Sequence, residues 1–107
     1  MTGYMLTFFT QQDRSHNHRP LHQWLLELVQ SMQIRGATVT AAQEGIGSHH
    51  RLHSAHFFEL ADQPIEIAMV VSATECDAIM ARLNEEPSLH LFYAKMPVEF
   101  GTIGQPL

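Results

Sequence analysis

The sequence predicts an α+β fold in which a four-stranded antiparallel sheet carries two helices on one face. Three observations lead to this prediction: two segments with helical spacing of apolar residues, four segments rich in β-branched or aromatic residues, and their order along the chain. That order is strand, helix, strand, strand, helix, strand. Two right-handed crossovers of this kind produce the ferredoxin-like βαββαβ arrangement. Because the chain has 107 residues, of which 45% are apolar, we expect a single domain over residues 1–107.

The first half of the chain contains the more regular helical pattern. Residues 4–10 are nearly continuous in hydrophobicity and predict the first strand, whereas 11–19 are polar and predict a loop that ends where Pro20 opens a helix. Gly36 is expected to end that helix as its C-cap. Residues 37–42 predict the second strand. The helical stripe at spacing i, i+3, i+4, i+7, i+8, i+11 comprises Leu21, Trp24, Leu25, Leu28, Val29 and Met32.

The second half begins with a long connection over residues 43–63, which shows no clean period. Residues 64–71 alternate with period two and predict the third strand. Ser72 and Glu75 have the spacing of a capping box, so a second helix starts there and ends near Asn84. Residues 90–100 predict the fourth strand. The apolar stripe of the second helix comprises Cys76, Ile79, Met80 and Leu83.

The predicted fold leaves one face of the sheet without cover. Two helices shield only one side, yet the first strand is apolar on both sides. Self-association would bury the open face. We therefore expect a homo-oligomer.

Composition excludes several classes of function. Six Lys and Arg face eleven Asp and Glu, a net charge of −5, which argues against nucleic-acid binding because that binding needs cations for the phosphates. No run approaches the roughly 18 apolar residues of a membrane span, so we expect no membrane insertion. The single cysteine, Cys76, excludes an internal disulfide framework and any CxxC motif, as expected of a cytoplasmic protein. Nucleophile-elbow, P-loop and HExxH motifs are absent from the sequence, and we expect no enzyme activity.

Histidines dominate the middle of the long connection. If this part is helical, the spacing of His49, His53 and His56 points three imidazoles the same way, as a zinc, copper or nickel site requires. The alternative is a solvated loop whose histidines bind an anion, a partner or nothing. A looser second group is formed by His16, His18 and His22.

Two glycines beside the second strand indicate a second kind of site. Gly45 and Gly47 can let a ligand approach the backbone, and successive free amides can bind an anion. The alternative is a turn with a β-bulge.

Three segments resemble a bacterial and archaeal family of unknown function that is grouped with the PII-like proteins. They are 19–21 (RPL), 36–39 (GATV) and 45–55 (GIGSHHRLHSA), and the resemblance covers nearly the whole chain. Members of the wider superfamily are ferredoxin-like homotrimers that bind small effectors, often adenine nucleotides, in clefts between subunits. A loop between their second and third strands contacts target proteins. Here that loop would be 43–63.

The resemblance implies an effector site made by Thr38, Gly45, Gly47, His49, Arg51 and His53. It departs from PII after the second helix, where PII proteins have a glycine-rich, lysine-containing loop and this chain has the carboxylates Glu85 and Glu86, which would repel a triphosphate. The main hypothesis is a PII-like homotrimeric sensor without enzyme activity that binds a small anionic effector, with an adenine nucleotide as one candidate. It would contact a target protein through 43–63. The alternative is a CutA-like trimer that binds a divalent metal through His49, His53 and His56.

Overall fold

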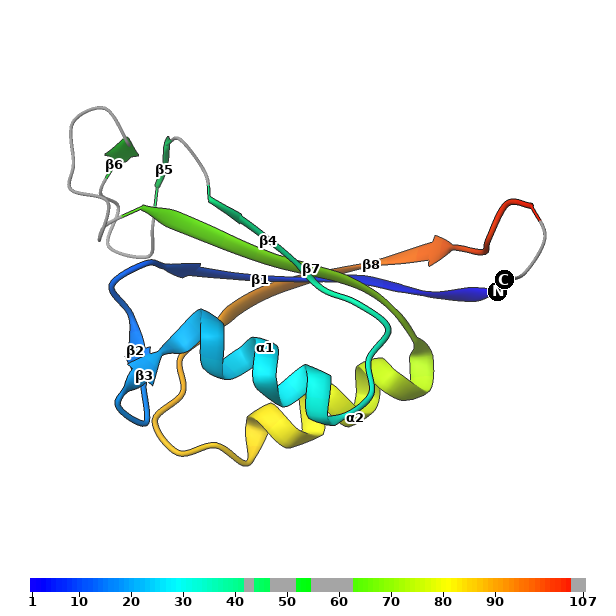
Figure 1. Ribbon diagram of the computed structural model, residues 1–107, viewed down its shortest axis with the longest axis horizontal. Coiled ribbons are helices and arrows are strands. Elements are labelled where there is room, and N and C mark those ends of the chain that lie inside the picture. The colour runs from blue at the N-terminus through cyan, green and yellow to red at the C-terminus, as the bar shows by residue number, and fades with distance from the viewer. Residues whose placement is uncertain (42–43, 47–51, 55–62, 105–107) are drawn as a thin grey trace.

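The computed structural model describes residues 1–41, 44–46, 52–54 and 63–104. Its four-stranded sheet is antiparallel throughout, in the order β4-β7-β1-β8, and Figure 1 shows both helices against the same face. The predicted α+β fold is therefore confirmed. The elements are β1 (Thr2–Gln11), β2 (Ser15–His16), β3 (Arg19–Pro20), α1 (Leu21–Ser31), β4 (Thr38–Ala41), β5 (Glu44–Ile46), β6 (Leu52–Ser54), β7 (Pro64–Ser72), α2 (Ala73–Asn84) and β8 (Phe92–Glu99).

The central strand β1 organises the sheet. It pairs with β7 along its whole length except Thr2, and with β8 on its other edge from Thr2↔Glu99 to Phe9↔Phe92. Its alternate residues Leu6 and Phe8 are buried against the helices. The sheet and the two helices enclose one core, whose buried members are Leu6, Phe8, Leu25, Val29, Ile65, Ile67, Met69, Val71, Cys76, Ile79 and Leu83.

Helix α1 begins as predicted but ends earlier. Pro20 occupies its N-cap position, where the missing N–H of proline costs nothing. The expectation that Gly36 caps the C-terminus is wrong: the helix ends at Ser31, and Gln33 takes the left-handed conformation with φ 61°. The amide of Gln33 donates to the carbonyl oxygen of Gln30 at 3.0 Å, which closes the last turn without a glycine.

Helix α2 confirms the predicted capping box. The Ser72 hydroxyl accepts a hydrogen bond from the amide of Glu75 at 3.1 Å, and the Glu75 carboxylate accepts one from the amide of Ser72 at 2.8 Å. Both groups would otherwise be unpaired in the first turn. The helix buries the predicted residues Cys76, Ile79 and Leu83 against the sheet.

The segment predicted as a loop over 11–19 contains a small β-hairpin. Strands β2 and β3 pair through Ser15↔Pro20 and His16↔Arg19. The two residues between them, Asn17 and His18, have φ 52° and 63°, and left-handed residues at both central positions suit a two-residue hairpin turn. Asparagine and histidine adopt this conformation more readily than most side chains, although glycine is its usual occupant. We call residues 15–20 the hairpin.

The face of the sheet away from the helices carries large apolar side chains, some of them exposed. Residues directly opposite each other on antiparallel strands share a face, so Phe9 lies with Phe92, and Met5 with Met96. The rings of Phe9 and Phe92 have centroids 5.6 Å apart. Phe92 is 72% exposed and Met96 is 58% exposed. We call Met5, Phe9, Phe92 and Met96 the open-face cluster.

Candidate functional site

The structure places three of the predicted effector residues. Thr38 is the first residue of the edge strand β4, where it is exposed and pairs with Ala68 of β7. Gly45 and His53 lie directly opposite each other in the antiparallel pair β5–β6. The backbone thus brings together two predicted positions that are eight residues apart in the sequence. Figure 1 shows β5 and β6 at the end of the molecule that also carries the hairpin.

The remaining predicted ligands, namely Gly47, His49, Arg51 and His56, together with His50, lie outside the described residues. His53 belongs to strand β6, so the helical premise for the spacing of the three histidines does not hold at His53. In the part of the chain that the structure describes, no group of three or more His, Cys, Asp or Glu residues could hold a metal ion.

A second group of polar side chains converges on Glu86, just after α2. One carboxylate oxygen of Glu86 accepts hydrogen bonds from His16 Nε2 at 2.8 Å and from the side-chain amide of Asn17 at 3.2 Å. The other oxygen accepts from the Arg82 guanidinium at 2.8 Å. We call these four residues the Glu86 clasp. It joins the hairpin to the end of α2.

The pair at the centre of the clasp, His16 and Glu86, is largely withdrawn from water. The side chains of His16 and Glu86 are only 9% and 11% exposed, and the His16 ring packs edge-on against Trp24 with centroids 4.4 Å apart. Hydrogen bonds from Arg82 and then His16 lower the pKa of Glu86 from 4.5 to about 2, because they stabilise the charged form of the carboxyl group. Glu86 is therefore a carboxylate at any neutral or mildly acidic pH.

The lowered pKa of Glu86 predicts a loss of stability in acid. Its folded-state pKa of about 2 lies below the ordinary value of 4.5, so its contribution is complete above the ordinary value and is lost as the pH falls through the folded value. Glu86→Gln cannot titrate. The difference in melting temperature between wild type and Glu86→Gln is expected to stay constant from neutral pH down to about 4.5 and to shrink toward about 2. A difference that does not change with pH would contradict this assignment.

The geometry changes what was expected of the carboxylates after α2. The sequence predicts that both Glu85 and Glu86 would repel a triphosphate, but both oxygens of Glu86 are engaged and its charge is balanced by Arg82. Repulsion at this position is left to Glu85, which is exposed. The obstacle to an anionic ligand is therefore smaller than the sequence suggests.

The three histidines of the second predicted group have different surroundings. His16 belongs to the clasp, whereas His18 is exposed at the hairpin turn. His22 lies in α1 with its Nδ1 buried, and no hydrogen-bond partner for that atom is present in the described ranges.

One part of the clasp could be recognised in the sequence, because Arg82 and Glu86 have the i, i+4 spacing of an ion pair on a helix. Asn17 and its bond to Glu86 carried no signal in the sequence.

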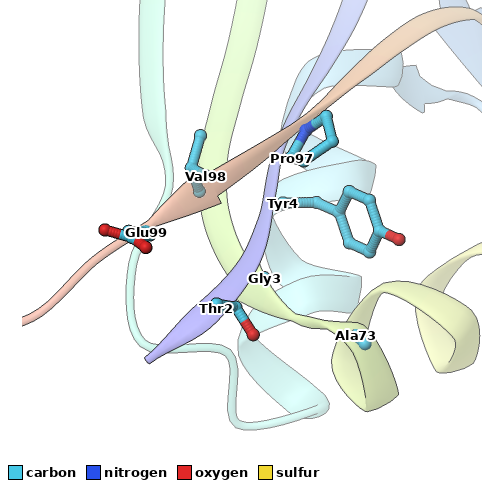
Figure 2. Close-up of a pocket in the computed structure, with 7 residues that line it drawn as sticks. All are labelled: Thr2, Gly3, Tyr4, Ala73, Pro97, Val98 and Glu99. Atoms are coloured by element: carbon cyan, nitrogen blue, oxygen red, sulfur yellow. The ribbon is translucent and has the colours of Figure 1, made fainter.

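A hollow of about 330 Å³ lies at the N-terminal end of β1. Figure 2 shows Tyr4 and Ala73 on one side of it and Glu99 pointing away on the other. None of the predicted effector residues that the structure describes, Thr38, Gly45 and His53, lines it. Its lining includes the acidic residue Glu99 and no lysine or arginine, so the hollow does not suit an anion. The lining residues are Thr2, Gly3, Tyr4, Ala73, Pro97, Val98 and Glu99.

Comparison with known proteins gives two kinds of match. Residues 3–94 match the model of the family DUF190, described as "Uncharacterized ACR, COG1993". A PII-like signalling protein from Thermus thermophilus has a similar structure, with a TM-score of 0.67 and 23% identity over 91% of this chain and 87% of the other. CPII from Thiomonas intermedia, a nitrogen regulatory PII-like protein bound to ADP, AMP and bicarbonate, has a TM-score of 0.58 and 17% identity over 92% and 89%. Among curated proteins, the sequence search found no relative.

The likeness to these two structures establishes the PII-like fold of the chain. Among the described residues, no helix is long and apolar enough to cross a membrane.

Proposed function

This chain belongs to the DUF190 family, and from that premise we propose that it is a PII-like regulatory protein without enzyme activity that binds a small anionic effector. The observation that carries the proposal is its PII-like fold, which it shares with a protein bound to ADP, AMP and bicarbonate. The single cysteine is buried and free, which suits the reducing cytoplasm in which we place the protein.

Described residues on the edge strand β4 and in the segment that follows it support an effector site there. Thr38 offers an exposed hydroxyl group on β4, and the β5–β6 pair brings Gly45 opposite His53. A glycine lets a ligand approach the backbone closely, and a histidine can donate to an anion. Arg82 balances Glu86, so an adenine nucleotide would meet less negative charge beside α2 than the sequence predicts. Thr38, Gly45 and His53 are the residues that would contact it.

The proposed assembly is a homotrimer built on the open-face cluster. Phe92 and Met96 are large apolar side chains that a monomer leaves in water. Patches of this kind on soluble proteins mark interaction surfaces. In a trimer, effector sites would lie between subunits, and the segment 43–63 would contact a target protein. The effector would change that contact only as far as it binds one arrangement of the protein better than another.

A thermal-shift experiment on tag-free protein tests the effector. We expect AMP or ADP to raise the melting temperature, because a ligand at a hundredfold excess over its Kd adds about 2.7 kcal/mol to the stability of the state that binds it. Bicarbonate should be tested alone and with each nucleotide. Thr38→Ala is expected to reduce the shift, whereas the matched control Thr102→Ala, at an exposed position beyond β8, should keep it.

Two outcomes would count against the nucleotide. Stabilisation by zinc, copper or nickel that His53→Ala abolishes, with no response to nucleotides, would favour the metal-binding alternative. No stabilisation by any of these compounds would contradict the effector proposal.

A further inference from the structure

Residues 12–20, which include the hairpin, contact two segments that are far from them in the sequence. At the tip of the hairpin, His16 and Asn17 donate to Glu86 on the connection between α2 and β8. Directly after β1, the amide of Gln12 donates to the carbonyl oxygen of Gln63 at 2.9 Å. Gln63 directly precedes β7. A short stretch of chain between β1 and α1 therefore bridges the start of β7 and the end of α2, as Figure 1 allows the reader to follow.

Both ends of this bridge are firmly attached. Glu86 is tied to α2 through Arg82 and through its own amide, which donates to the carbonyl oxygen of Leu83 at 3.1 Å. On the other side, the amide of Leu21, the first residue of α1, donates to the carbonyl oxygen of Arg14 at 2.9 Å. The segment between β1 and α1 is thus hydrogen-bonded to the first residue of α1 as well as to Gln63, which precedes β7.

The backbone at the tip needs external support. Asn17 and His18 are two consecutive left-handed residues, neither of them glycine. Such conformations cost free energy and persist where surrounding contacts hold them. Glu86 holds the side chains at the tip, His16 also packs on Trp24, and Arg19 of β3 forms an ion pair with Glu27 of α1. Because β2 and β3 are only two residues long each, the bonds to Glu86 contribute a large share of what holds the tip.

We propose that residues 12–20, with the hairpin at their tip, form a strap that couples the start of β7 to the connection between α2 and β8, with Glu86 as the contact that can be released. A ligand or partner that draws Glu86 away from His16 frees the hairpin and loosens the bond between Gln12 and Gln63. Because coupling between two sites is reciprocal, breaking the bond between Gln12 and Gln63 weakens the hydrogen bonds from the hairpin to Glu86 by the same free energy. This coupling is a property of the protein without effector, so it does not depend on the proposed function.

Amide hydrogen exchange on the unliganded protein, resolved by NMR, tests the strap. Glu86→Ala is expected to speed exchange at the Gln12 amide and at the hairpin amides by about an order of magnitude, because hydrogen bonds to a charged acceptor are among the stronger ones. Exchange in β1 and in the middle of α2 should change far less. Trp24 is the chain's one tryptophan and touches His16, so its fluorescence emission should also change.

The neighbouring residue supplies the matched control. Glu85 is an exposed glutamate one position away whose side chain makes none of the described contacts, so Glu85→Ala should leave both the exchange and the Trp24 emission as in wild type. If Glu86→Ala does not fold, Glu86→Gln keeps the size of the side chain and one acceptor oxygen, and should give a smaller change of the same kind. Unchanged exchange at Gln12 in a folded Glu86 variant, or an equal change in Glu85→Ala, would overturn the proposal.

Discussion

Gly3→Ala is expected to destabilise the protein strongly. A Cβ atom at position 3 would overlap with the carbonyl oxygen of Val71 and would stand 2.9 Å from the Phe100 ring. The Val71 oxygen belongs to the backbone of β7, so β1 and β7 would have to separate. Overpacking costs about 1–3 kcal/mol where side chains can move aside. Because a backbone atom is the obstacle here, we expect about 3 kcal/mol or more, a large part of the roughly 5–15 kcal/mol of a typical domain.

Denaturant unfolding of two control variants separates this clash from a general effect of alanine. At Gly36 an added Cβ meets no atom within 4 Å, so Gly36→Ala should shift the free energy of unfolding by less than about 0.5 kcal/mol. Phe100→Ala in the Gly3→Ala background removes the ring but not the Val71 oxygen. It should fail to restore stability. A Gly3→Ala protein as stable as Gly36→Ala would contradict the steric argument.

The helices and the sheet could be predicted because they are encoded locally. The stripe from Leu21 to Met32 and the spacing of Ser72 and Glu75 each specify a helix within a few residues. The end of α1 was not predictable in the same way. Glycine takes the left-handed conformation most readily, which is why Gly36 was expected to end the helix. Gln33 takes that conformation instead, because its hydrogen bond to the carbonyl oxygen of Gln30 offsets the conformational cost.

The clasp could not be predicted because its contacts are not local. His16 and Glu86 are 70 residues apart, and only the arrangement of the sheet brings the hairpin to the end of α2. The spacing of Arg82 and Glu86 was readable, but it predicts an ordinary surface ion pair and not an acceptor shared by three donors. The hairpin itself was hidden because Asn17 and His18 occupy a turn that glycine usually marks.

Part of the candidate effector site could likewise be predicted from the sequence, and part could not. Thr38 was placed correctly on a strand because residues 38–40 are β-branched. The pairing of Gly45 with His53 was missed, since the histidine spacing was considered only for a helix or a solvated loop, whereas His53 belongs to a strand. A short stretch without periodic apolar residues is compatible with a helix or with a strand, so its structure is decided by the segment with which it pairs.

The open-face cluster is the surface on which the proposed trimer depends. Met96 lies opposite Met5, and Phe92 opposite Phe9, in the same register of β1 and β8. Burying a methionine or phenylalanine side chain contributes about 1.5–3 kcal/mol, and a trimer would bury each of them in every subunit. The aromatic pair is also already formed within one chain, which reduces the side-chain entropy lost on assembly.

Met96→Asp is therefore expected to convert the trimer fully to a monomer. The wild type should show three times the 12.1 kDa mass of one chain by light scattering, and the variant should show that mass itself. Met96 is 58% exposed within one chain, so the carboxylate remains hydrated in the monomer and the fold should survive, whereas in a trimer it would be buried without a partner. Ile103→Asp places the same charge at a fully exposed apolar position outside the sheet and should leave the mass unchanged. A wild-type monomer would refute the proposed trimer, and a Met96→Asp trimer would show that subunits associate through another surface.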